Sequence, residues 1–216
     1  MENLVIYGAG GFAREVLWLV EEINKKSLKW NVLGFVDDNQ ENWGKILNGK
    51  EILGGREFLN SLSSEIYIII AIGNGETREK IVNDLGERRY ATLIHPEITC
   101  DKTISIGEGS IICKGTIITV NISIGKHIII NLDCSIGHDV IIENYVTIFP
   151  SVNISGGVNI RKCSSIGTST VVLQYLNIGS YTTIGSLSNI IKDIPSHCVA
   201  VGNPARVIKN RGENNV

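Results

Sequence analysis

The chain has 216 residues, with 20 basic against 22 acidic side chains and a formal charge of −2. This balance provides no basic stripe of the kind that nucleic-acid binding needs, so we expect no nucleic-acid partner. Aromatic residues make up only 6% of the chain, whereas Ile occurs 36 times, which indicates a globular fold with an aliphatic core. No apolar run approaches the roughly 20 residues of a membrane span, so we expect no membrane insertion.

The N-terminus and the cysteines indicate a cytoplasmic protein. The first residues contain an early acidic side chain and no basic stretch, which is unlike a secretory signal peptide. The five Cys are odd in number and form no C-x-x-C pair, so we expect reduced thiols.

Up to about residue 95, short apolar runs alternate with helical stretches. Residues 4–7, 31–36 and 65–73 have the composition of strands, and residues 12–26 carry apolar side chains at helical spacing. A further helix is expected to begin after Asn74. This alternation predicts a small parallel sheet, in an α/β, Rossmann-like half-domain over residues 1–95.

A glycine-rich segment, GAGGFA over residues 8–13, links the first expected strand to the first expected helix. Its G-x-G-x-x-A pattern in this context is typical of a loop that holds phosphate at a helix N-terminus. A dinucleotide site is one interpretation, but the domain is half a dinucleotide fold. Asp37 also lies 29 residues after Gly8, later than the roughly 20 residues usual for the ribose contact. A tight turn that binds nothing is the other interpretation.

A different pattern governs the second half of the chain. Every sixth position from 106 to 190 is a branched aliphatic residue, and fourteen of these fifteen residues are Ile. Hexapeptide periodicity is typical of a parallel β-helix, in which three repeats close one triangular coil. We therefore expect five coils over residues 96–194, with the repeated residue pointing inward, and a C-terminal cap and tail over residues 195–216.

The faces of this expected β-helix carry little charge. Between residues 146 and 191, only Arg161 and Lys162 are charged. Either Ser, Thr and Asn solvate these faces, or neighbouring copies of the chain cover part of them in a ring with cyclic symmetry. We expect the second arrangement.

Three motifs in this order complete the pattern: GAGGFAREV with FVDD and AIGN, then SIGHDVIIE, then VGNPARVI. On a hexapeptide ladder they resemble the hexapeptide-repeat sugar O-/N-acetyltransferases of the sialic acid O-acetyltransferase and nucleotide-amino-sugar N-acetyltransferase type. The resemblance implies a left-handed parallel β-helix, a homotrimer, and acetyl-CoA as co-substrate in a cleft between subunits, without a metal. It also implies acetyl transfer to an amine or hydroxyl of a nucleotide-linked sugar in surface-glycan synthesis.

His138 is the candidate general base. It follows the inward Ile136 by two residues, so we expect it to project outward from a coil corner, where an imidazole can take a proton from the acceptor. By resemblance, Asp139 orients the imidazole. Neighbouring residues on a strand point to opposite faces, so this contact requires a bend in the chain. An exposed histidine without a catalytic role is the alternative.

The resemblance also implies two groups of binding residues. For CoA these are Thr147, Gly156, Gly167, Thr168, Gly185, Ser186, Lys192 and Pro204, with the Gly156 backbone N–H facing the thioester. For the nucleotide sugar they are Gly10, Gly11, Phe12, Asp37, Asp38, Gly73 and Asn74. Some characterised amino-sugar acetyltransferases carry His at the place of Phe12, and some relatives carry His at the place of Thr147.

Two other function classes compete with this one. A β-helix metal hydratase of the carbonic-anhydrase type needs three His ligands, and His127 and His138 have no suitable third partner in the sequence. A non-catalytic binding protein would bind CoA without turnover, or would bind neither substrate. The sequence does not distinguish an amine from a hydroxyl acceptor.

Overall fold

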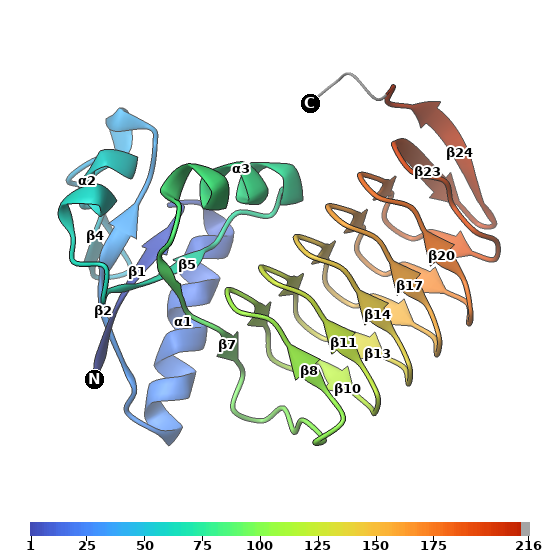
Figure 1. Cartoon of the computed structure of the whole chain (residues 1–216), viewed down its shortest axis with the longest axis horizontal. Helices are drawn as coiled ribbons and strands as arrows, with labels where there is room; N and C mark the ends of the chain where they lie inside the picture. The colour runs from blue at the N-terminus through green and yellow to red at the C-terminus, as the bar shows by residue number, and fades with distance from the viewer. Residues whose placement is uncertain (213–216) are drawn as a thin grey trace.

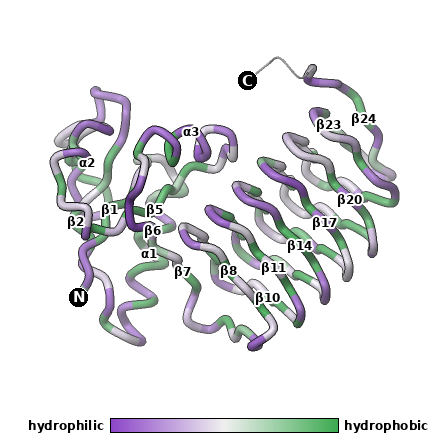
Figure 2. The backbone as a smooth tube through the Cα atoms, in the orientation of Figure 1, coloured by the Kyte–Doolittle hydropathy of each residue, from purple (hydrophilic) through white to green (hydrophobic). Residues whose placement is uncertain are grey.

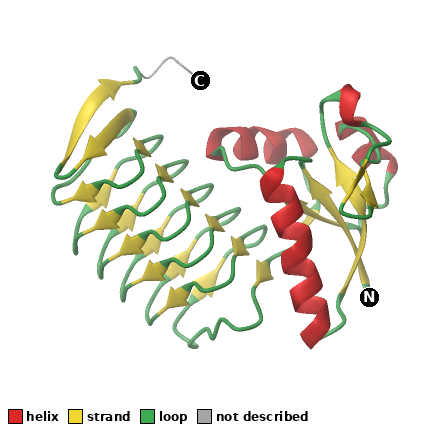
Figure 3. Ribbon diagram, turned by 180° about the vertical axis from the view of Figure 1, so that it is seen from behind, coloured by secondary structure: helices red, strands yellow, loops and turns green. Residues whose placement is uncertain are grey.

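The two halves of the sequence fold into two bodies that pack side by side (Figure 1). The computed structural model describes residues 1–212. An α/β domain is followed directly by a β-helix that ends in a hairpin, and Figure 3 shows the same arrangement from behind. The predicted α/β and β-helical parts are therefore both confirmed.

The N-terminal domain is built on a four-stranded parallel sheet in the order β2-β1-β5-β6. Its strands are β1 (Glu2–Tyr7), β2 (Trp30–Val36), β5 (Tyr67–Ile70) and β6 (Arg89–Tyr90). Its helices are α1 (Gly11–Lys26), the short η1 (Gln40–Asn42), α2 (Arg56–Ser61) and α3 (Gly75–Leu85), and a small hairpin joins β3 (Ile46–Leu47) to β4 (Lys50–Glu51).

Both faces of this sheet are buried, which explains the nearly continuous apolar runs in its strands. Leu4 and Ile6 of β1 pack with α1, whereas Val5 and Tyr7 pack with residues of α2 and α3. Four strands make half of a dinucleotide fold, as the sequence predicted.

The β-helix has three sheets, which we call S1, S2 and S3, and their strands are parallel except for the last strand of S2. S1 contains β8 (Ser105–Ile106), β11 (Ser123–Ile124), β14 (Ile141–Ile142), β17 (Asn159–Ile160) and β20 (Asn177–Ile178). S2 contains β7 (Leu93–Ile94), β9 (Ile111–Ile112), β12 (Ile129–Ile130), β15 (Thr147–Ile148), β18 (Ser165–Ile166), β21 (Thr183–Ile184), β23 (Cys198–Gly202) and β24 (Ala205–Asn210). S3 contains β10 (Ile117–Ile118), β13 (Ser135–Ile136), β16 (Asn153–Ile154), β19 (Val171–Val172) and β22 (Asn189–Ile190).

The chain runs from S1 to S2 to S3 in every coil, so strands 18 residues apart are hydrogen-bonded neighbours. From Ile112 to Ile190, the repeated aliphatic residue of every strand is buried in one continuous core. Figure 2 shows hydrophobic positions recurring in each coil. The predicted inward face and the five coils of β8–β22 are confirmed.

The corners between the sheets depend on a second repeat of six. All fourteen positions taken every sixth residue from 109 to 187 have a positive φ, and eleven of them are not glycine. A side chain in this left-handed conformation costs roughly 1–2 kcal/mol. The conformation turns the chain sharply at each corner, and the packed Ile core has to offset its cost.

The two ends of the core are closed by different segments. Ile94, Ile98 and Ile104 pack against it at the N-terminal end, before the first complete coil. At the C-terminal end, the antiparallel hairpin of β23 and β24 buries Ala200 and Ala205 against the last coil. The predicted tail extends to residue 216, and its positions 213–216 lie outside the described residues.

Four of the five cysteines are buried and Cys100 is exposed, and all five are free thiols. Within residues 1–212, no helix combines the length and the apolar character needed to cross a membrane.

Candidate functional site

His138 and Asp139 lie on the corner between S3 and S1, directly after β13. The Nδ1 atom of His138 is 2.8 Å from Oδ2 of Asp139, and about half of each side chain is exposed. Asp139 has a φ of 59°, one of the left-handed corner residues. This bend turns two sequence neighbours toward each other, which an extended strand does not allow.

The charge state of Asp139 determines which imidazole nitrogen is free. The hydrogen bond from His138, and then that from Asn121, hold the pKa of the Asp139 carboxyl below its usual value. An ionised carboxylate only accepts hydrogen bonds, so it favours a proton on Nδ1 of His138. Nε2 is then left with a free lone pair, as a general base requires.

Gly156 provides the surface against which this imidazole lies. It belongs to the next coil, 18 residues after His138, and a Cβ built on it would collide with Nε2 of the imidazole. The N–H of Gly157 donates to the His138 carbonyl at 2.8 Å, which fixes the two coils together. The structure thus brings His138, Asp139 and Gly156 into one cluster.

Exposed apolar side chains also lie on S3, on the S3/S1 corner and on S1, mostly in coils before and after the one that carries His138. We call them the apolar strip, and they are exposed in the single chain. The strip consists of Ile117, Val120, Ile141, Val171, Leu173, Tyr175 and Ile191. Several exposed apolar side chains on one side of the β-helix are a candidate interaction surface.

Other predicted CoA-binding residues lie on two different corners. Gly167, Thr168, Gly185 and Ser186 are on the S2/S3 corner, across S3 from His138. Lys192 is on the S3/S1 corner near the end of the β-helix, and Pro204 lies in the turn between β23 and β24. A Cβ on Gly167 would collide with backbone atoms of Gly185 and Ser186, so coil stacking alone explains that glycine.

Thr147 is not available to a ligand. It points outward from β15 in S2, on the face that the N-terminal domain covers, and only 1% of it is exposed. Its hydroxyl donates to the Gly73 carbonyl at 2.6 Å and accepts from Nη1 of Arg78 at 2.9 Å. In this structure the Thr147 side chain therefore joins the two domains, and its hydroxyl is occupied by Gly73 and Arg78.

A cavity of about 390 Å³ lies at the carboxyl ends of the parallel strands β1, β2 and β5. Ligands of open α/β sheets bind at this edge. The lining includes Tyr7, Asp37, Asp38, Arg56 and Lys80. The cavity therefore combines two predicted aspartates with two cations and a phenol.

Hydrogen bonds hold these side chains in place. Both oxygens of Asp38 lie 2.8 Å from the Tyr7 hydroxyl, and Arg56 Nη2 donates to Asp38 at 2.9 Å. Burial, followed by the bond to Asp38, raises the pKa of Tyr7 to about 12, so Tyr7 is a neutral donor. Arg56 also pairs with Asp84. Asp37 accepts from the Ala9 N–H at 3.0 Å, which ties it to the glycine-rich loop.

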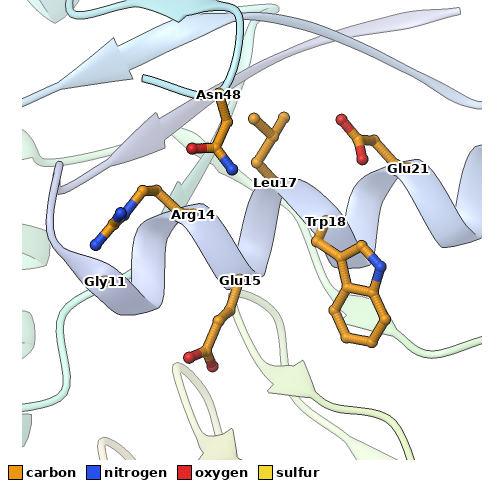
Figure 4. A pocket seen from close by; sticks show the side chains of 7 residues that line it. All are labelled: Gly11, Arg14, Glu15, Leu17, Trp18, Glu21 and Asn48. Carbon is orange, nitrogen blue, oxygen red and sulfur yellow. The ribbon is translucent and has the colours of Figure 1, made fainter. Parts of the chain in front are cut away.

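The glycine-rich loop opens α1, with Gly10 as its N-cap residue and no side chain capping it. A Cβ on Gly10 would meet nothing within 4 Å, so the N-terminus of α1 is sterically open. Phe12 is half-buried against the core of the sheet. Gly11 instead lines a second, open cavity on the outer face of α1, with Arg14, Trp18 and Asn48 among its neighbours (Figure 4).

Gly73 and Asn74 connect β5 to α3. Asn74 caps the helix, since its Oδ1 accepts from the Thr77 N–H at 2.8 Å. The Gly73 carbonyl is occupied by Thr147 and by Arg78. The cavity is lined by the residues on either side of this pair, Ile72 and Thr77, and not by Gly73 or Asn74.

Tyr7, Arg56 and Lys80 were absent from the sequence-based prediction. They belong to no recognisable motif, and each is brought to the cavity from a different element. Only the basic character of Arg56 and Lys80 signals anion binding, and basic residues are common elsewhere in the chain.

Within one chain, the cavity and His138 face different corners of the β-helix. α3 packs on the S1/S2 corner, where Gly75 abuts the Tyr145 carbonyl and Glu79 pairs with Lys162. His138 is on the S3/S1 corner. Among residues 1–212, no three His, Cys, Asp or Glu side chains form a possible metal-ligand group.

Comparisons with known proteins agree with this architecture. Residues 3–85 match the model of the PglD N-terminal domain. The acetyltransferase domain of PglB from Neisseria gonorrhoeae, in complex with acetyl coenzyme A, superposes with a TM-score of 0.86 at 28% identity, covering 96% of this chain and 99% of that one. WeeI from Acinetobacter baumannii gives a TM-score of 0.84 at 30% identity, over 96% of this chain and 100% of that one.

Among curated proteins, UDP-N-acetylbacillosamine N-acetyltransferase of Bacillus subtilis is 32% identical over 118 residues, or 52% of this chain and 51% of that protein. The first curated relatives are matched over only 27% to 51% of their own lengths. The α/β domain, the hexapeptide β-helix and these similarities define one class of protein. The chain belongs to the hexapeptide-repeat sugar O-/N-acetyltransferases, with an N-terminal domain of the PglD type.

Proposed function

We propose that the chain is an acetyl-CoA-dependent acetyltransferase that acts on a nucleotide-linked sugar in surface-glycan synthesis. The observation that carries this proposal is the His138–Asp139 pair, with its exposed imidazole against Gly156. A β-helix needs neither an outward imidazole nor a paired carboxylate for its stability. General-base catalysis needs an accessible base, and a paired carboxylate orients the imidazole and stabilises its charged form.

In the proposed reaction, Nε2 of His138 takes a proton from the acceptor amine or hydroxyl while the acceptor attacks the thioester carbonyl. The resulting tetrahedral oxyanion is stabilised by an N–H donor, for which Gly156 is the candidate. The C–S bond then breaks, and the imidazolium returns its proton as the thiol of CoA leaves. Asp139 keeps the imidazole oriented and stabilises its charged form.

The names of the relatives favour an amine on a nucleotide-linked sugar as the acceptor. The Bacillus subtilis relative is a UDP-N-acetylbacillosamine N-acetyltransferase, and a relative from Aneurinibacillus thermoaerophilus acetylates a dTDP-linked 3-amino sugar. The cavity between Asp38, Arg56 and Lys80 supports this, because cations can hold a diphosphate and a carboxylate can accept from ribose or base. We place the nucleotide there, beside the loop of Gly10 and Gly11.

We further propose a homotrimer as the active form. The apolar strip would be covered by a neighbouring copy, which explains its exposure in one chain. The cavity at the carboxyl ends of β1, β2 and β5, which we call the α3 cavity, faces a different corner from His138 within one chain. A neighbour would therefore bring its own α3 cavity toward His138. CoA would then lie between copies, with Gly156 on one side and the candidates Gly167, Thr168, Gly185, Ser186, Lys192 and Pro204 along its path.

The free thiols, four of them buried, fit the cytoplasmic location that we propose. The test of the activity is a thiol-release assay with acetyl-CoA against UDP- and dTDP-linked amino sugars and free sialic acids. Release that requires a nucleotide-linked amino sugar is expected. Turnover with sialic acid alone would move the acceptor to a free sugar, and CoA binding without turnover would overturn the enzyme assignment.

A further inference from the structure

Arg78 is a buried cation at the junction of the two domains. It lies on α3, only 1% of it is exposed, and it is among the largest fully buried side chains. Among residues 1–212, no carboxylate forms an ion pair with it. Its guanidinium instead donates to five backbone carbonyls and one hydroxyl, at 2.7–3.1 Å: those of Ile72, Gly73, His127, Tyr145, Val146 and Thr147.

Stability alone does not account for this arrangement. Removing a cation from water costs several kcal/mol, and apolar residues of similar volume often stabilise a fold equally well. Burial lowers the pKa of Arg78 to about 9, so the side chain keeps its charge at neutral pH. What the planar, rigid guanidinium adds is orientation, because its donors fix several carbonyls at once.

The carbonyls that Arg78 holds come from two places. Ile72 and Gly73 form the link from β5 to α3, and Ile72 lines the α3 cavity. The other carbonyls belong to two successive coils at the S1/S2 corner. Arg78 therefore joins one wall of the cavity directly to the β-helix of the same chain.

The two faces of α3 divide these tasks. Thr77, Lys80 and Ile81 line the cavity. Gly75 and Arg78 face the β-helix, and a Cβ on Gly75 would collide with the Tyr145 carbonyl. The absence of that atom lets the first turn of α3 approach closely enough for Arg78 to reach both coils.

We propose that Arg78 is a positioning residue for the acceptor: it fixes the link from β5 to α3, whose Ile72 lines the cavity, relative to the β-helix, and so sets the place of the nucleotide-linked sugar. The proposal rests on the proposed function for its kinetic consequence. The CoA candidates lie on other corners, so Arg78 acts on the acceptor side only.

The test compares Arg78→Met with the wild type, using the nucleotide-linked amino sugar that gives the fastest thiol release. We expect the KM for that sugar to rise at least 10-fold, with the KM for acetyl-CoA unchanged within twofold. Glu79→Gln is the matched control, since it removes the neighbouring contact with Lys162 and leaves the wall untouched. Both of its KM values are expected within twofold of the wild type. A folded Arg78→Met protein with both KM values unchanged would overturn the proposal.

Two further measurements cover the other outcomes. If Arg78→Met does not fold, Thr147→Val removes the second bond to the Gly73 carbonyl, and we expect the same selective rise in the sugar KM, by about threefold. An unchanged KM in that variant would contradict the proposal.

If the wild type turns over no sugar, the proposed function fails by itself. Hydrogen exchange of the backbone amides in residues 72–77 then tests the role of Arg78. The proposal requires faster exchange in Arg78→Lys than in the wild type, with exchange in the β-helix unchanged.

Discussion

The Nδ1 atom of His138 and the Oδ2 atom of Asp139 are 2.8 Å apart although the two residues are adjacent in the chain. The left-handed φ of Asp139 makes this possible, and the next coil supports the imidazole with a glycine. The same corner conformation occurs at every sixth residue, so the fold provides this geometry without a special loop.

Replacing His138 with Ala removes the proposed base. We expect acetyl transfer, measured by thiol release, to fall by about 100- to 10,000-fold. Because about half of the His138 side chain is exposed, the melting temperature is expected to change little. His197→Ala, at the far end of the β-helix, is the control and is expected to retain activity. Near-normal transfer by a folded His138→Ala protein would remove the assignment.

Gly156→Ala tests the surface beneath the imidazole. The added methyl group would collide with Nε2 of His138, and the exposed imidazole is free to move away. We therefore expect a loss of kcat/KM of at least about 10-fold, with a stability change under about 1 kcal/mol, as is usual for a surface substitution. Chemical denaturation and steady-state kinetics on the same preparation separate the two effects. If the loss of activity is fully explained by a loss of folded protein, Gly156 has a purely structural role.

Nucleotide binding should be visible in thermal unfolding. A ligand present at 100 times its Kd stabilises the folded state by about 2.7 kcal/mol. For a chain of this size, that is a rise in Tm of about 5–10 °C. We expect it with UDP or dTDP, and expect Asp38→Asn to reduce it, because that carboxylate orders Tyr7 and Arg56. No shift with any nucleotide would count against a phosphate-binding loop.

The apolar strip predicts a specific assembly. Ile117→Glu places a charge on S3, where a neighbouring copy is proposed to pack. We expect light scattering to show a particle of three chains for the wild type and single chains for this variant, with loss of acetyl transfer. Leu28→Glu, which changes a similarly exposed residue outside the strip, is expected to remain trimeric. A wild-type monomer in solution would contradict both the assembly and the shared site.

His127 predicts a loss of stability in acid. The imidazole is buried between Tyr90 and Tyr145, and burial lowers its pKa from 6.5 to about 4. The unfolded chain therefore binds more protons between these pH values, so stability falls as the pH decreases. The expected loss between pH 7 and pH 5 is about 2 kcal/mol. Urea denaturation should show this difference, and His127→Phe should flatten the curve. An unchanged slope in the variant would show that His127 is not the titrating group.

The repeat of Ile every six residues was sufficient to predict the β-helix, its inward face and its five coils. Each coil contacts only its neighbours, so the pattern that packs one coil packs them all. The same repeat also predicted that His138 lies on a corner, because His138 follows the inward Ile136 by two residues. The predicted contact with Asp139 depended only on the bend of that corner.

Contacts between distant segments decided the rest. Thr147 occupies an outward position of the third coil, and nothing nearby in the sequence shows that the N-terminal domain covers this face. Arg78 takes its role from contacts that form only when the two domains dock. Tyr7 and Arg56 meet at Asp38 only when distant segments of the N-terminal domain pack together. Local periodicity thus determined the scaffold and the place of the imidazole. The acceptor cavity and its attachment to the β-helix depended on long-range packing, which a repeating pattern does not encode.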